Sequence, residues 1–151
     1  MIFGGFLLKQ TFELAFCCAA SFSHTRPTFV SLDPSTFQNP VPVGSVLYLT
    51  ATVVYTDPPL ERASSDPDSP TNGQTRLQIR VDSKVRDVEH GETKPTGQFN
   101  YTFTVDKYVK VMPRTYSEYM MYIDARRRVR GVLESMKQSS SDAWEVERVT
   151  E

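Results

Sequence analysis

The chain has 151 residues, enough for one domain with a hydrophobic core of its own. Its formal net charge of −1 excludes a nucleic-acid or anionic-membrane partner that would be recognised by bulk charge. Hydrophobic residues make up 39% of the chain and aromatic residues 11%, which is typical of a globular protein rather than a disordered one. Cys17 and Cys18 are adjacent and would point about 100° apart in a helix, so no disulfide framework is expected.

The first stretch, Phe6–Ser23, is predicted to be a buried helix. Apolar side chains point almost all round it, and such a helix is normally surrounded by other structure. Gly4 and Gly5 open the helix, while Glu13 is an acid in its middle that costs free energy unless it is paired or used. A secretory signal is the alternative for this stretch, but Lys9 and Glu13 interrupt the apolar run, and the same charges exclude a membrane span.

After this helix the sequence changes to short segments with the alternation and β-branched content of strands. The expected strands are Thr28–Asp33, Ser45–Thr56, Thr75–Val88, Thr96–Val105 and a short one, Tyr108–Met112. Both faces of Ser45–Thr56 are largely apolar, which favours a strand that is covered on both sides or central in its sheet. The segment Asp57–Gln74 is rich in proline and serine and is expected to be a surface loop inserted between two strands.

The last element is predicted to be a helix that begins with a capping box, in which Glu118 follows Thr115 by three residues. We expect one domain over residues 1–112, a C-terminal helix over residues 113–137 and a disordered tail over Gln138–Glu151. One buried helix followed by four or five antiparallel strands and a helix predicts an α+β fold, in which a sheet curls round a central helix.

Several motifs resemble those of the hotdog-fold acyl-CoA thioesterases. They are Ile2-Phe3-Gly4-Gly5-Phe6-Leu7-Leu8, Phe12-Glu13-Leu14-Ala15, the turn from Phe37 through Pro42-Val43-Gly44-Ser45, and the segment from Pro113-Arg114-Thr115-Tyr116 to Asp124. The last segment narrows the resemblance to the second hotdog domain of the mitochondrial type, which carries two such domains in one chain. The resemblance covers about Ile2 to Arg128 and is interrupted by a fungal-like insertion at Asp57–Gln74.

The resemblance implies a hotdog fold, an antiparallel β-sheet wrapped round a central helix, with the first strand missing because Met1 stands where that strand ends in the family. It implies hydrolysis of fatty acyl-CoA to free fatty acid and coenzyme A, with neither a metal nor a cofactor. The implied partners are the acyl-CoA substrate and another hotdog domain, as a homo-oligomer or as a missing N-terminal half, and no nucleic acid. It also implies a mitochondrial location, with the cytoplasm as the alternative. The alternative function, favoured by Phe12 and the missing strand, is a catalytically silent binding or assembly module, or an inactive truncated product.

Gly4 and Gly5 are the candidate oxyanion hole, because glycines at a helix start let backbone amides approach a thioester carbonyl. Close packing of the helix against a strand is the alternative use of these glycines. Glu13 is the candidate catalytic residue, as a general base or a nucleophile, and burial among aromatic side chains would suit a base. An ordinary i, i+4 ion pair with Lys9 is the alternative. Many hotdog thioesterases also place their catalytic aspartate one residue earlier, where this chain has Phe12.

The remaining candidates are weaker. Cys17 and His24 would lie on one helix face, but seven residues or about 10 Å apart, which is too far for a nucleophile–base hydrogen bond. His90 is expected in a loop, so no metal-binding cluster of His, Cys and acidic residues is predicted. Arg126–Arg128 and Arg130 would suit the phosphates of coenzyme A, but their pattern favours a solvated helix end, and the phosphate-binding residues stay unassigned.

Overall fold

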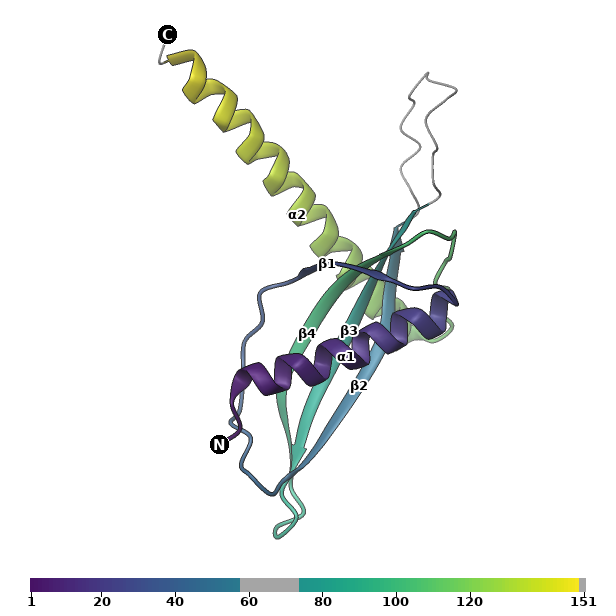
Figure 1. The fold of residues 1–151 in the computed structure, drawn as a ribbon, viewed down its shortest axis with the longest axis vertical. Helices are drawn as coiled ribbons and strands as arrows, with labels where there is room; N and C mark the ends of the chain where they lie inside the picture. Colours follow the sequence, from purple (N-terminus) through teal and green to yellow (C-terminus); the bar gives the residue numbers. More distant parts are fainter. Residues whose placement is uncertain (58–73, 150–151) are drawn as a thin grey trace. The chain divides into compact units, whose positions relative to one another are not determined.

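The computed structural model describes the backbone of residues 1–57 and 74–149 and the side chains of residues 1–57 and 74–139. The chain divides into two compact units, Met1–Met112 and Pro113–Glu151. The elements, which can be followed in Figure 1, are α1 (Gly4–Ser23), β1 (Thr28–Leu32), β2 (Val46–Asp57), β3 (Thr75–Arg86) and β4 (Thr93–Val105) in the first unit and α2 (Tyr116–Val149) in the second. The predicted insertion at Asp57–Gln74 falls almost entirely on residues 58–73, outside the described residues.

The first unit contains one antiparallel sheet with the strand order β1-β4-β3-β2. The two central strands pair along their whole length, from Thr75 opposite Val105 to Arg86 opposite Thr93. Helix α1 crosses one face of this sheet and contacts β2, β3 and β4 (Figure 1). The predicted α+β arrangement of an antiparallel sheet against a central helix is therefore confirmed.

One row of α1 side chains faces the sheet. Every fourth residue is buried, and the row consists of Leu7, Thr11, Ala15, Ala19 and Ser23. The small side chains of Ala15 and Ala19 are completely buried in a core shared with the inward residues of β3 and β4. The opposite row is exposed and consists of Gly5, Lys9, Glu13, Cys17 and Ser21. Within the described residues the helix is therefore covered on one side, not all round as its apolar composition predicted.

Strand β2 is an edge strand, which corrects the prediction that this segment is central or covered on both sides. Among the described residues it pairs with β3 alone, and Val46 and Tyr48 are 43% and 47% exposed. Its two apolar faces are visible in the sequence, but the number of its neighbours is not, because pairing depends on distant segments. This edge strand of 12 residues has no charged residue before Asp57 at its end, so it is able to accept a further strand. The strand that the family resemblance places before Ile2 would be one such partner, and it remains a prediction.

Two predictions about the second half of the chain differ from the structure. Tyr108–Met112 is not a strand. Its Val111 N–H donates a hydrogen bond to a side chain, Thr56 Oγ1 at 3.0 Å. Helix α2 continues to Val149, whereas a disordered tail was expected from Gln138. From Gln138 the stretch combines glutamate, arginine and alanine, which favour a helix, with three serines and an aspartate, which favour it less, so composition alone does not decide where α2 ends.

The N-terminus of α2 has the predicted capping box. The Glu118 N–H donates to Thr115 Oγ1 at 3.3 Å, and Glu118 Oε2 accepts from the backbone N–H groups of Arg114 at 2.8 Å and Thr115 at 3.3 Å. These backbone hydrogen bonds, the one from Arg114 first, lower the pKa of Glu118 from its ordinary value. The reciprocal bonds fix where α2 begins.

Candidate active site

Helix α1 begins without a side-chain cap. The residue before it, Phe3, is extended with φ −68° and ψ 135° and provides no capping hydrogen bond, and the first turn contains no acidic residue. In the first turn the Phe6 N–H donates a hydrogen bond to the Phe3 carbonyl at 3.0 Å, and the aligned peptide dipoles place partial positive charge at this end of the helix. The start of this 20-residue helix at Gly4 and Gly5 therefore suits an oxygen on which negative charge develops.

The two glycines at this helix start have different surroundings. A Cβ atom added to Gly4 would lie 3.2 Å from Cζ of Phe37, which is tighter than most van der Waals contacts, so packing also requires a small residue there. A Cβ added to Gly5 would lie 2.8 Å from Cε1 of Phe3, but that side chain is 82% exposed and free to move. Gly4 therefore has a packing role as well as an exposed amide end, and Gly5 lies on the open face of the helix.

Glu13 lies in the exposed row of α1 and not among the aromatic side chains. Its side chain is 56% exposed, and Oε1 lies 4.0 Å from Nζ of Lys9, in the i, i+4 ion pair that was the alternative interpretation of the sequence. Glu13 follows Gly4 by nine residues, which is about 13 Å along the helix at 1.5 Å per residue. A general base must come within about 3 Å of the proton that it removes. The structure therefore does not bring Glu13 together with the glycines of its own chain.

Phe12, at the position where the family resemblance implied an aspartate, is packed in an aromatic cluster. Its ring centroid lies 5.2 Å from that of Phe29, 5.9 Å from Tyr101 and 6.0 Å from Phe103. The contacts with Phe29 and Tyr101 have the edge-to-face geometry that aromatic pairs prefer. This position of α1 therefore contributes to the core and offers no acid or base.

A buried hydroxyl pair under α1 was not predicted from the sequence. Thr11 Oγ1 and the Tyr101 hydroxyl lie 2.7 Å apart, and the carbonyl oxygen of Leu8 is 3.1 Å from the first and 3.3 Å from the second. Burial raises the pKa of Tyr101, and the hydrogen bond with Thr11 opposes this shift. The one signal in the sequence was a polar residue, Thr11, within an apolar helix. This pair links α1 to β4 and so helps to hold in place the helix that begins with Gly4 and Gly5.

The cysteines and histidines do not form a site. Cys17 is exposed and Cys18 is half-buried, and burial, followed by the charge of its neighbour, raises the pKa of Cys18. His24 caps the C-terminus of α1 with φ 56°, and His90 lies 2.9 Å from Oδ2 of Asp87 in the turn after β3. In the described part of the chain no group of three or more His, Cys, Asp or Glu side chains could hold a metal ion. Nor is any described helix both long and apolar enough to cross a bilayer.

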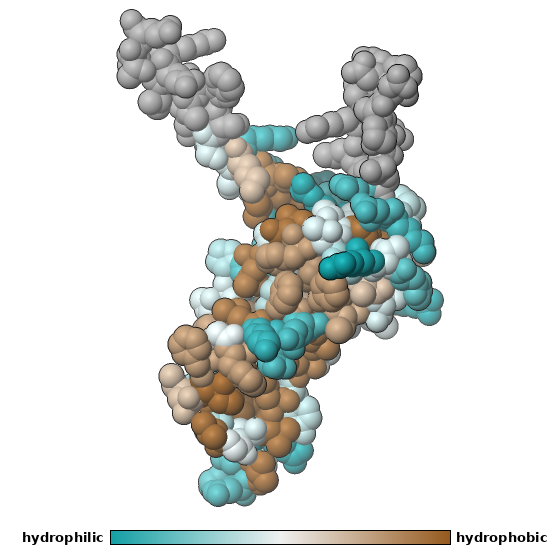
Figure 2. Space-filling view, in the orientation of Figure 1, coloured by the Kyte–Doolittle hydropathy of each residue, from teal (hydrophilic) through white to brown (hydrophobic). Residues whose placement is uncertain are grey.

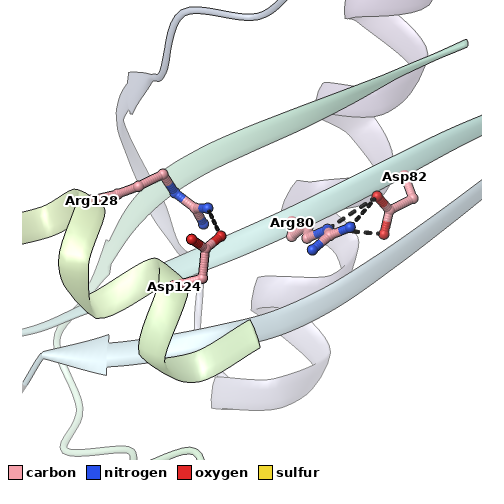
Figure 3. Close-up of polar contacts among 4 residues, drawn as sticks. All are labelled: Arg80, Asp82, Asp124 and Arg128. Carbon is pink, nitrogen blue, oxygen red and sulfur yellow. Dashed lines mark hydrogen bonds and ion pairs between the residues drawn. The ribbon is translucent and has the colours of Figure 1, made fainter. Parts of the chain in front are cut away.

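Two of the arginines form local ion pairs (Figure 3). Arg128 pairs with Asp124 one turn earlier in α2, and on β3 Arg80 Nη2 lies 3.0 Å from Oδ1 of Asp82. Arg128 is therefore engaged within its own helix. The exposed arginines of this stretch of α2 are Arg126, Arg127 and Arg130. They are solvated as expected, but they lie within α2 and not at its end, because the helix continues to Val149.

Solved acyl-CoA hydrolases share this fold. An apo-hexameric acyl-CoA thioesterase is 22% identical with a TM-score of 0.72, and the match covers 89% of this chain and 81% of that chain. An acyl-CoA hydrolase from Staphylococcus aureus, in complex with butyryl coenzyme A, coenzyme A and coenzyme A disulfide, is 21% identical with a TM-score of 0.71, over 99% and 84% of the two chains. No family model matches the sequence. The fold is thus the hotdog fold of the acyl-CoA hydrolases, as the sequence motifs predicted.

Curated relatives refine this assignment. Acyl-coenzyme A thioesterase 9, mitochondrial, of Mus musculus is 37% identical over 127 residues, which are 83% of this chain and 25% of that protein. The Homo sapiens protein of the same name matches to the same extent, and acyl-coenzyme A thioesterase 2, chloroplastic, of Humulus lupulus is 33% identical over 135 residues, 89% of this chain and 28% of that protein. The chain is homologous to the mitochondrial acyl-CoA thioesterases 9 and 10. It spans about a quarter of the length of these relatives.

Proposed function

We propose that this chain is a hotdog domain of an acyl-CoA thioesterase, which hydrolyses fatty acyl-CoA to free fatty acid and coenzyme A. The observation that carries the proposal is the 37% identity to a mitochondrial acyl-CoA thioesterase across 83% of the chain. The uncapped helix start at Gly4 and Gly5 supports it, because its amides suit a thioester oxygen. By the same homology we propose a mitochondrial location and correspondence to the second hotdog domain of the two-hotdog type.

The proposed reaction begins with the thioester oxygen near the amides of the first turn of α1. A carboxylate removes a proton from water, the oxygen of that water attacks the carbonyl carbon, and the negative charge moves to the carbonyl oxygen. The helix start stabilises this charge more strongly than it stabilises the neutral substrate, which lowers the barrier. Collapse of the intermediate breaks the carbon–sulfur bond, and the thiolate of coenzyme A takes up a proton.

The carboxylate in this scheme belongs to a second hotdog domain. Glu13 is about 13 Å along α1 from Gly4, so one domain offers the amide end and the acid at separate places. A second hotdog domain, from another copy or from another part of a longer chain, would complete the site by placing its own acid opposite these amides. Among the solved structures with this fold, an acyl-CoA thioesterase and a thioesterase from Yersinia pestis are both hexameric.

The experiment is hydrolysis of acyl-CoA by the purified protein, with two substitutions on the exposed row of α1. Glu13→Gln removes the carboxylate and is expected to lower kcat about 10²–10⁴-fold if Glu13 is the general base. Lys9→Gln is the matched control, because it breaks the same ion pair and keeps the carboxylate. Its kcat should stay within about threefold of the unsubstituted protein, since an exposed i, i+4 pair contributes only about 0.3–0.5 kcal/mol.

The second candidate function is a catalytically silent hotdog module that binds acyl-CoA or assembles with an active partner. It is favoured by Phe12, which is packed in the core, and by the exposed ion pair of Glu13. Equal, small effects of Glu13→Gln and Lys9→Gln on hydrolysis would show that Glu13 is not catalytic. Binding of acyl-CoA without measurable hydrolysis would identify the chain as the silent module.

A further inference from the structure

The side chain of Phe37 forms a wall beside the glycine start of α1. Its ring is so close to Gly4 that a Cβ there would lie 3.2 Å from Cζ and 3.4 Å from Cε2. The segment that carries Phe37 lies between β1 and β2, far from α1 in the sequence. The ring therefore borders the first-turn amides from outside the helix.

The position of Phe37 is held by the N-terminal part of β4. Its backbone forms an isolated bridge with Gly97, and the next residue, Gln38, donates its N–H to the carbonyl of Thr96 at 2.8 Å. The ring meets the fully buried Phe99 edge-to-face, with the centroids 5.7 Å apart. At Gly97 a Cβ would lie 3.3 Å from the Phe99 ring and 3.5 Å from the carbonyl of Thr36, so glycine lets these segments approach. Phe37 is thus a fixed part of the fold.

Although it is fixed, Phe37 keeps 48% of its surface exposed. Two further phenylalanines at the start of α1 are also exposed, Phe3 by 82% and Phe6 by 50%. Figure 2 shows that the face carrying α1 is largely apolar, interrupted by hydrophilic patches. Aromatic surface left in water beside a candidate site marks a place where an apolar ligand group can bind.

We propose that Phe37 is a specificity-determining residue of the thioesterase site, and that its ring contacts the α-carbon of the acyl group; this rests on the proposed function. A thioester oxygen that accepts a hydrogen bond from a first-turn amide lies about 2.7–3.2 Å from the nitrogen. The carbonyl substituents then lie within van der Waals reach of a ring that contacts Gly4. The acyl group matches this surface better than the pantetheine arm, because amide groups of pantetheine would lose hydrogen bonds to water against phenylalanine rings.

The proposal predicts discrimination against substituents at the α-carbon. A straight acyl chain has two hydrogens there and passes the ring, whereas a methyl branch collides with a ring that packs on Phe99 and whose backbone is bridged to Gly97. Phe37→Ala removes the wall, and Phe37→Leu reduces it. Phe29→Ala is the matched control, because Phe29 is 46% exposed but contacts the separate aromatic cluster of Phe12.

The test measures kcat/KM for butyryl-CoA and 2-methylbutyryl-CoA with each variant of the full chain. Phe37→Ala is expected to raise the ratio of the branched to the straight substrate at least tenfold, Phe37→Leu to raise it less, and Phe29→Ala to leave it unchanged. The far-ultraviolet circular dichroism of each variant confirms that it is folded. An unchanged ratio in folded Phe37→Ala, or an equal rise in Phe29→Ala, overturns the proposal.

A binding measurement separates this proposal from the proposed function. If no variant hydrolyses either substrate, the proposed hydrolysis fails, and the contact is then tested with the thioether S-butyl-coenzyme A, which cannot be hydrolysed. Phe37→Trp is made in a Trp144→Phe background, so that the introduced indole is the sole tryptophan. A saturable shift in its emission that is absent from Phe29→Trp supports the contact, and no shift at saturating thioether overturns it.

Discussion

The buried hydroxyl pair that ties α1 to β4 gives a prediction whose size follows from the structure. Thr11 and Tyr101 are 0% and 2% exposed, and their oxygens lie 2.7 Å apart. Tyr101→Phe keeps the ring and removes one hydroxyl, while Thr11 Oγ1 keeps the Leu8 carbonyl as an acceptor at 3.1 Å. The substitution leaves no cavity and no buried donor without an acceptor. Tyr101→Phe should therefore lower the free energy of unfolding by the value of one hydrogen bond, about 1 kcal/mol.

A double-mutant cycle makes the prediction sharper. Thr11→Val removes the other hydroxyl at nearly constant volume and leaves the Tyr101 hydroxyl with the Leu8 carbonyl at 3.3 Å, so it too should cost about 1 kcal/mol. The double variant replaces a polar pair by an apolar pair of the same shape, which is close to neutral. The double variant should therefore cost about 2 kcal/mol less than the sum of the two single variants, as a coupling energy between residues in contact.

The assay for this cycle is urea denaturation, in which equal slopes and shifted midpoints report changes in stability. In a thermal melt, 1 kcal/mol should appear as a shift of about 4–8 °C for a unit of this size. Additive costs in the double variant, or single variants as stable as the original chain, would refute the assignment of a coupled pair.

The pH dependence provides an independent check on the same side chain. Burial raises the pKa of Tyr101 above its ordinary value of 10.0. A phenol with a raised pKa keeps its proton in the folded state while the unfolded chain loses it, so the associated stability is present below pH 10 and is lost as the pH rises through the folded pKa. The urea midpoint of the unsubstituted chain should fall more between pH 9 and pH 11 than that of Tyr101→Phe. Equal falls would contradict this reasoning.

Two further substitutions test the sheet, one on the central strand β4 and one on the edge strand β2. Thr96→Val should raise the free energy of unfolding by about 1–3 kcal/mol, because Thr96 Oγ1 is buried without a hydrogen-bond partner in the described part of the chain. A lower urea midpoint for the variant would show that the hydroxyl has a partner. Tyr48→Lys places a charge on the exposed edge strand β2 and should reduce self-association through that edge. The sedimentation coefficient at micromolar concentration should then be smaller. An unchanged coefficient would show that the chain does not associate through this edge.

The sequence predicted most of the secondary structure because the relevant patterns are local. Apolar alternation located the four strands of the sheet, and Thr115 with Glu118 located the start of α2. Local patterns do not report which strands become neighbours, so an apolar edge strand was expected to be central. They also do not report the rotation of a helix that is apolar all round, and that rotation decides that Leu7 and Thr11 are buried while Glu13 is exposed.

The candidate site was predicted in part for the same reason. Gly4 and Gly5 were identified because glycines at a helix start are a local signal. The partners that define their surroundings are distant: Tyr101 lies 90 residues after Thr11, and the ring of Phe37 comes from the segment between β1 and β2. No spacing rule connects such positions, since they meet only when β4 brings them under α1.

The separation of Glu13 from Gly4 makes the two candidate functions depend on one physical question, which is what covers the exposed row of α1. In the single chain this row is solvated, and a solvated carboxylate paired with Lys9 has water, not substrate, as its surroundings. A second hotdog domain that covered this row would remove Glu13 from bulk water. A buried carboxylate costs free energy unless it is paired or takes part in the reaction. An acid that stays exposed in the assembled protein would be a surface residue, and the domain would contribute only its glycine helix start. The comparison of Glu13→Gln with Lys9→Gln decides between these outcomes, because the two substitutions break the same ion pair and only one removes the carboxylate.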